Sequence, residues 1–148
     1  MSGRSGIVVG VDGSGHSVRA LQWAAREAAL REVPLTVITV HQPAVGYWGS
    51  AVSYPEDHAL SVRIRAAVRE QTEKVIAGLG ENIPPQFSVD AVSGSPAEEV
   101  LIAAKEADLL VVGSRGAGGF ARLVLGSVSS QVAQHAHCPV VVIPAGDQ

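Results

Sequence analysis

The stretch Ala107-Asp-Leu-Leu-Val-Val-Gly113-Ser-Arg-Gly116, followed after nine further residues by Gly126-Ser127, decides the fold of this chain. Its first part is short, apolar and rich in β-branched residues, which is typical of a buried strand. Ser127 opens a helical pattern that runs to His135, and its hydroxyl can cap the free N–H groups of that helix. Glycine lets a backbone approach an anion, and a helix N-terminus favours negative charge. The order strand, glycine-rich loop, helix therefore predicts a phosphate-binding loop.

Composition bounds the fold class. Hydrophobic residues make up 47% of the chain but aromatic residues only 4%, so the core has to be built from Val, Leu, Ile and Ala. This balance favours an α/β protein with a parallel sheet over an all-β sandwich. A chain of 148 residues is most simply one domain, spanning residues 1–148, and can bury a core on both faces of a sheet.

Charge and cysteine content argue against several classes of protein. The net charge is −3 and the 11 basic residues are scattered, so we expect no nucleic-acid partner. The first six residues lead directly into an apolar strand pattern, which predicts neither a signal peptide nor a membrane-spanning segment. Cys138 is the single cysteine. An internal disulfide is therefore excluded, and a reducing, cytoplasmic location is expected.

Strand and helix patterns alternate along the whole chain. Short apolar runs predict five strands, and amphipathic runs between them predict four helices. The third helix opens with Ser95-Pro-Ala-Glu98, which has the form of a capping box with proline at the first helical position. The expected strands cover residues 7–11, 35–40, 87–92, 107–112 and 139–144, and the expected helices cover residues 17–31, 56–79, 96–107 and 127–135.

This alternation predicts the topology. Right-handed crossovers give a doubly wound parallel sheet with strand order 3-2-1-4-5 and helices on both faces, a Rossmann-like three-layer sandwich. Ligands of such sheets bind beyond the carboxyl ends of the strands, where the strand order reverses. Here that point lies between the first and fourth strands, and the glycine-rich loop follows the fourth strand directly.

Two better-known phosphate motifs do not account for the loop. A Walker A loop needs a lysine after its last glycine, and the only lysines, Lys74 and Lys105, do not follow glycine. Gly116-Ala-Gly118-Gly-Phe-Ala121 has the form of a dinucleotide fingerprint, but that motif needs an acidic residue about 20 positions further on. Residues 136–141 contain no acid, so we interpret this match as coincidental.

The full pattern Gly-x2-Gly-x9-Gly-Ser resembles that of the ATP-binding branch of the universal stress protein family. Three further segments are similar to family segments: the opening Ile7-Val-Val-Gly-Val-Asp-Gly-Ser14, the turn Gly94-Ser-Pro96 and the closing Cys138-Pro-Val-Val-Val-Ile-Pro144. The resemblance covers essentially the whole chain. It implies an adenine-nucleotide alpha-hydrolase-like fold and ATP as the ligand, with Mg²⁺ accompanying the phosphates.

The resemblance also implies a role for each matching residue. Gly10 and Asp12 would line the adenosine, with Asp12 accepting from a ribose hydroxyl, and the backbone of Val40 would read the adenine edge. Gly113, Arg115 and Gly116 match the loop that passes under the ribose and α-phosphate, and residues 126–129 would hold the β- and γ-phosphates. Gly118 and Gly119 have the alternative role of giving this loop mobility. The implied nucleotide-binding residues are Gly10, Asp12, Val40, Gly113, Ser114, Arg115, Gly116, Ala117, Gly118, Gly119, Gly126, Ser127, Val128 and Ser129.

Some of these residues also have a structural interpretation. Asp12 can form an Asx turn with Gly13 and Ser14, and Ser127 can cap its helix without competing with a phosphate at the same helix end. No protein carboxylate near Ser127 is evident as a magnesium ligand, so phosphate oxygens and water would hold the ion. The five histidines show no spacing that supports a metal site.

The sequence leaves the activity open. Fast ATP hydrolysis needs a base and charge neutralisation, and Arg115 or Arg122 supplies at most the second. This favours a nucleotide-dependent sensor or regulator of the stress response over a slow ATPase or phosphotransferase, and no catalytic residue is identified. Cyclic AMP or another adenine nucleotide would use the same adenosine site.

Two partners are expected besides the nucleotide. The run Val140-Val-Val-Ile143 is too apolar for an exposed edge strand, and the family commonly pairs this strand across a two-fold axis, so we expect a homodimer through residues 139–144. A regulatory protein partner, whose identity the sequence does not give, would respond to the nucleotide. Residues 43–55, which contain Tyr47 and Trp48, follow the proposed adenine-reading strand and are expected to become ordered on nucleotide binding.

Overall fold

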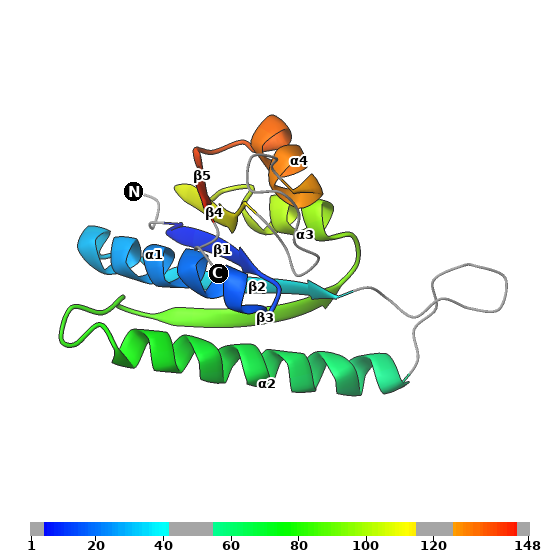
Figure 1. Cartoon of the computed structure of the whole chain (residues 1–148), viewed down its shortest axis with the longest axis horizontal. Coiled ribbons are helices and arrows are strands. Elements are labelled where there is room, and N and C mark those ends of the chain that lie inside the picture. The colour runs from blue at the N-terminus through cyan, green and yellow to red at the C-terminus, as the bar shows by residue number, and fades with distance from the viewer. Residues whose placement is uncertain (1–4, 42–54, 115–125, 145–148) are drawn as a thin grey trace, which may run out of the picture.

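The computed structural model describes residues 5–41, 55–114 and 126–144 of the chain. Within these residues five strands alternate with four helices (Figure 1). In chain order the elements are β1 Ile7–Val11, α1 Gly15–Arg31, β2 Leu35–His41, α2 Pro55–Ala77, β3 Phe87–Ser93, α3 Pro96–Ala103, β4 Leu109–Gly113, α4 Ser127–His135 and β5 Val140–Ile143.

The strands form one sheet in the order β3-β2-β1-β4-β5, with every neighbouring pair parallel. This confirms the predicted topology. From β1 the chain first adds β2 and β3 on one side, and then returns to add β4 and β5 on the other. The strand order therefore reverses between β1 and β4, which is where doubly wound sheets bind their ligands.

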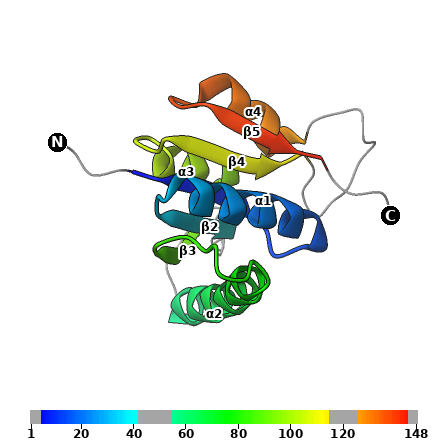
Figure 2. The same cartoon turned by 90° about the vertical axis from the view of Figure 1, so that its left-hand side faces the viewer.

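The two faces of the sheet are covered by different helices (Figure 2). Alternate β1 residues belong to separate clusters: Ile7, Val9 and Val11 pack with α1, whereas Val8 packs with α3 and α4. Helix α1 presents a nearly all-alanine buried face to the sheet, with Leu21 as its one large, fully buried side chain. Small side chains let α1 lie close to the strands, so the Val- and Leu-rich strands supply most of the core volume.

Helix α1 begins at Gly15, two residues before the expected Ser17. An Asx turn brings this about, because Asp12 Oδ1 accepts hydrogen bonds from the Ser14 amide at 2.9 Å and the Ser14 hydroxyl at 2.5 Å. Gly13 has a φ of 82°, which a residue with a side chain rarely adopts. The Ser14 carbonyl then accepts a hydrogen bond from the Ser17 amide at 3.2 Å, so Ser17 already lies within the helix.

The expected capping box of the third helix is wrong. Ser95 is the N-cap of α3, but its side chain makes no capping hydrogen bond. Glu99 instead packs over Gly94, where an added Cβ would lie 2.8 Å from Glu99 Oε2. Gly94 also has a φ of 150°, a conformation that favours glycine.

Helix α3 ends at Ala103 and β4 begins at Leu109, so residues expected in the helix and the strand form the connection instead. Asp108 explains where β4 begins. Its amide donates to the Gly6 carbonyl at 2.9 Å, and its Oδ2 accepts from the Gly6 amide at 3.0 Å. This reciprocal pair fixes the start of β4 beside the start of β1.

Helix α2 runs alongside β3 and carries i,i+4 ion pairs, including Arg69–Glu73 at 3.4 Å and Lys74–Glu70 at 3.8 Å. Among the described residues, no helix combines the length and the apolar character that a membrane crossing requires.

Replacing Leu21 with alanine should lower the free energy of unfolding by about 2–5 kcal/mol, because it leaves a cavity between α1 and the sheet. Leu21 is fully buried, whereas Leu30 on the same helix is 69% exposed, so Leu30→Ala should change stability by less than about 0.5 kcal/mol. Urea denaturation of both variants measures the difference. Equal effects would contradict the packing of α1 on the sheet.

Candidate functional site

The carboxyl ends of β1, β2 and β4 meet at one end of the sheet. The β1–β4 register pairs Val9 with Val111, which places Val11 level with Gly113 two residues further on. Asp12 follows β1 and Ser114 follows β4, so these residues lie on neighbouring strands at the point where the strand order reverses. We call this region, together with the N-terminus of α4, the strand-end site.

Ser114 organises this end of the sheet through its backbone. Its amide donates to the Ile143 carbonyl at 2.9 Å, which continues the pairing of β4 with β5. Its carbonyl accepts the Gly126 amide at 2.8 Å. The two ends of the glycine-rich segment are thereby joined, and the first turn of α4 is held against the end of β4.

The N-terminus of α4 is formed by Gly126 and Ser127. Gly126 is the N-cap, with φ −65° and ψ 164°, and no side chain caps the helix in the described part of the chain. Ser127 is therefore the first helical residue and not the cap that its sequence position suggested. The first intrahelical bond joins the Ser130 amide to the Gly126 carbonyl at 3.0 Å. The amides of the three residues between them precede it and have no acceptor within the helix.

Ser129 has a different role from Ser127. Its side chain is buried, with an exposed fraction of 2%, and its hydroxyl lies 3.1 Å from the Gly126 carbonyl and 3.4 Å from the Ser114 carbonyl. The hydroxyl thus donates to the backbone at the base of the glycine-rich segment. Ser127 is exposed at the end of the helix. The backbone amide of Ser129, rather than its hydroxyl, is the group suited to an anion.

Asp12 forms the Asx turn described above, and its side chain is exposed. Because a carboxylate has two oxygens, engaging Oδ1 in the turn does not prevent Oδ2 from accepting a further donor. The Asp12 amide donates to the Ser17 hydroxyl at 3.4 Å, and that hydroxyl in turn donates to the Ser14 carbonyl at 3.0 Å. Ser17 is buried and fixes the turn, a role that the sequence pattern did not indicate.

Gly10 has a packing role that sequence reasoning missed. A Cβ added there would lie 3.3 Å from Val100 Cγ2 and 3.6 Å from Val112 Cγ1. The absent side chain therefore lets α3 pack against β1 just before the strand-end site. Val40 is partly buried and packs against the cluster that Val8 forms with α3 and α4. The β1–β2 register ends at Val11 and Thr39, one residue before Val40.

His41 is a second residue that the sequence did not single out. Its Nε2 lies 2.7 Å from the Ser61 hydroxyl of α2, and its carbonyl accepts the Gly94 amide at 3.0 Å. These contacts tie the end of β2 both to α2 and to the turn before α3. A lone histidine after a strand carries no sequence signal of such a link.

Several predicted residues lie outside the described residues. These are Arg115, Gly116, Ala117, Gly118, Gly119 and Arg122, together with Tyr47 and Trp48 of the 43–55 segment. The described strand-end site therefore brings together Asp12, the ends of β2 and β4, and the start of α4. In the described ranges, no group of three His, Cys, Asp or Glu side chains could hold a metal ion.

The fold and this site define a doubly wound α/β protein of the type that binds ligands beyond its strand ends. Comparison with known proteins gives the family. The model of the universal stress protein family matches residues 4–144. A universal stress protein of Mycolicibacterium smegmatis is 38% identical over 150 residues, which covers 97% of this chain and 49% of the relative. The chain therefore belongs to the universal stress protein family.

Two solved structures are similar over nearly their whole length. A universal stress protein crystallised in complex with cAMP is 28% identical, with a TM-score of 0.71 and coverage of 98% of this chain and 100% of that one. The universal stress protein UspA from Lactobacillus plantarum is 26% identical, with a TM-score of 0.70 and coverage of 96% and 99%. By contrast, the chain spans about half the length of the curated relatives it matches, 49% of the Mycolicibacterium smegmatis protein.

Replacing Ser129 with alanine should lower the free energy of unfolding by about 0.5–1.5 kcal/mol, because the variant loses a buried hydroxyl that bonds the backbone of the strand-end site. Ser127→Ala on the same helix turn removes an exposed hydroxyl and should change stability by less than about 0.5 kcal/mol. Thermal unfolding followed by circular dichroism compares the two. A larger loss for Ser127→Ala would contradict the assigned positions.

Proposed function

We propose that this chain binds an adenine nucleotide, ATP in particular, at the strand-end site and acts as a nucleotide-dependent sensor or regulator in the stress response. The observation that carries the proposal is the N-terminus of α4, which no side chain of the described residues caps and which the Gly126–Ser114 hydrogen bond holds at the end of β4. Uncapped helix amides and the helix dipole favour a phosphate at this position.

The nucleoside part of the proposal rests on the neighbouring strands. Asp12 at the end of β1 would accept from a ribose hydroxyl, and the backbone of Val40 would face the adenine. The solved universal stress protein with cAMP supports an adenine nucleotide by similarity, since it resembles this chain over nearly its whole length. Cyclic AMP is thus the alternative ligand. The Gly-x2-Gly-x9-Gly-Ser pattern, which resembles that of the ATP-binding branch, favours the triphosphate.

The proposed phosphate-binding residues 126–129 are all uncharged. Mg²⁺ bound with ATP would therefore take its ligands from phosphate oxygens and water. The same lack of charge argues against a fast ATPase, because hydrolysis needs a base and a positioned water. A slow ATPase or phosphotransferase is the alternative activity. The single cysteine of the chain supports a cytoplasmic location.

Replacing Gly126 with valine should weaken ATP binding at least about tenfold, or about 1.4 kcal/mol, because the side chain obstructs the approach of phosphate to the α4 amides. The backbone angles of Gly126, φ −65° and ψ 164°, are open to any residue, so the variant should fold. Titration calorimetry with Mg²⁺-ATP measures the affinity.

The matched control is Gly78→Val, just beyond the C-terminus of α2, where an added Cβ meets its nearest neighbour at 3.4 Å. Its affinity for ATP should equal that of the unmodified protein. A folded Gly126→Val variant with unchanged affinity would contradict the site. Mass spectrometry of the nucleotide released from the denatured protein decides the ligand: ATP agrees with the proposal, and cAMP alone favours the alternative.

Nucleotide binding should also slow amide hydrogen exchange in residues 43–55 and 115–125, because phosphate and adenine contacts restrict segments next to the site. Exchange measured by mass spectrometry, with and without saturating ATP, tests this effect. Protection limited to the α4 N-terminus would make ATP a static ligand and remove the basis for a sensor.

A further inference from the structure

The sheet ends in two edge strands, β3 and β5, and the hydrogen-bond pattern identifies which backbone groups each presents outward. In β3 the Gln86 carbonyl and the Gly94 amide bond to β2, so the residues between them alternate and Phe87, Val89, Ala91 and Ser93 present their amides and carbonyls outward. Such a row of unpaired groups is a template for pairing with another chain.

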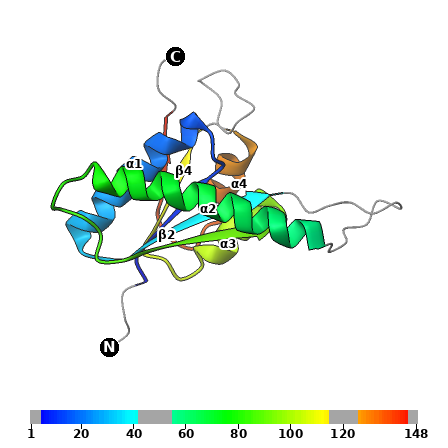
Figure 3. The ribbon, with the colours of Figure 1, turned by 90° about the horizontal axis from the view of Figure 1, so that it is seen from below.

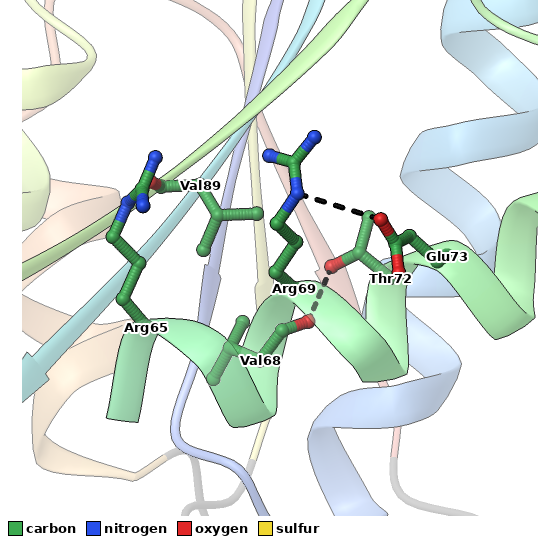
Figure 4. Close-up of polar contacts among 6 residues, drawn as sticks. All are labelled: Arg65, Val68, Arg69, Thr72, Glu73 and Val89. Carbon is green, nitrogen blue, oxygen red and sulfur yellow. Dashed lines mark hydrogen bonds and ion pairs between the residues drawn. The ribbon is translucent and has the colours of Figure 1, made fainter. Parts of the chain in front are cut away.

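Helix α2 supplies a hydrogen bond to the outward side of β3. Arg65 of that helix donates from Nε to the Val89 carbonyl at 2.8 Å, one of the outward-facing carbonyls (Figure 4). One turn further along α2, the Arg69 guanidinium lies 4.9 Å from the ring centroid of Phe87 and is paired with Glu73 at 3.4 Å. Two cationic side chains of one helix therefore contact β3, Arg65 at an outward carbonyl and Arg69 at the ring of Phe87.

The position of α2 agrees with these contacts. The helix lies beyond β3 at that end of the sheet in Figures 1 and 2, and it runs in front of β3 when the molecule is seen from that end (Figure 3). Val68 faces the core from the same helix, with an exposed fraction of 3%. The buried side of α2 thus holds the helix on the sheet, which places Arg65 at the strand edge.

Among the residues that the structure describes, none makes such a contact with the other edge strand, β5. In β5 the Pro139 and Ile143 carbonyls bond to β4, so Val140 and Val142 present their backbone groups outward. Within the described ranges, no side chain bonds to the backbone of Val140 or Val142. The side chains of β5 are all only partly buried.

We propose that Arg65 restricts edge-to-edge association of this protein to β5. A sheet with one open edge can pair with a second copy of itself about a two-fold axis, and the pairing then stops at two chains. A sheet with two open edges can continue to add copies. The closure of β3 is inferred from the Arg65–Val89 hydrogen bond. The dimeric state of the unmodified protein is a separate matter, because it rests on the proposed pairing of residues 139–144.

Four proteins test the proposal by sedimentation velocity over a range of concentrations. Arg65→Met removes the donor but keeps an unbranched side chain with similar helix propensity. Val142→Pro removes an outward amide of β5 without removing a bond to β4. The unmodified protein should be a dimer, and Val142→Pro should be a monomer. Arg65→Met should form a series of species larger than a dimer. The double variant should form a dimer that pairs through β3.

Arg63→Met is the matched control, because Arg63 is exposed on the same helix and the change in charge is the same. It should sediment as the unmodified protein does. Cooperative thermal melting of each variant, followed by circular dichroism, establishes that it is folded; Arg65→Gln replaces Arg65→Met if the latter fails this criterion. A double variant that forms a dimer and nothing larger also distinguishes edge pairing from aggregation of unfolded protein.

The outcomes distinguish the two ideas. If folded Arg65 variants sediment as the unmodified protein does and the double variant is a monomer, the closure of β3 by Arg65 is wrong. If the unmodified protein is a monomer and Arg65→Met a dimer, the closure holds and the pairing through β5 is wrong. Larger species formed equally by Arg63→Met would overturn the proposal, since a loss of charge alone would then explain them.

Discussion

The hydrogen bond from the Gly126 amide to the Ser114 carbonyl, 2.8 Å long, fixes the relation between α4 and the sheet. The amides of the next three residues have no acceptor within the helix. The buried Ser129 hydroxyl supports the same carbonyl at 3.4 Å. A helix end without a side-chain cap is normally satisfied by water or ligand, so this contact sets both the position and the chemistry of the strand-end site.

Much of this fold could be read from the sequence because its elements are strongly patterned. The valine-rich runs around Val9 and Val111 are buried on both sides, and a continuous apolar run of that length has few alternatives to a central parallel strand. The residues at which helices and strands begin were harder to predict. The start of α1 depends on an Asx turn at Asp12 and the start of β4 on a pair between Gly6 and Asp108, which are 102 residues apart in the chain. Local periodicity carries no information on such a contact.

The candidate site was predictable in outline and not in its polar detail. The glycine spacing predicted that a helix starts near Gly126. It could not decide whether Gly126 or Ser127 is the N-cap, because both residue types are acceptable there. Ser17, His41 and Ser61 act through tertiary hydrogen bonds whose partners are set only by the folded sheet. Gly10 was assigned to the ligand, yet the structure also gives it a packing reason, the close approach of Val100.

The pairing of Gly6 with Asp108 has a consequence for the order of folding. The β2–β3 unit with α2 is built from contacts between neighbouring segments, whereas joining β1 to β4 closes a loop of about a hundred residues, with the corresponding loss of chain entropy. Contacts of such long sequence separation form slowly. We therefore expect the β2–β3 half to fold first, so that the strand-end site, which needs β1 and β4 side by side, is assembled last.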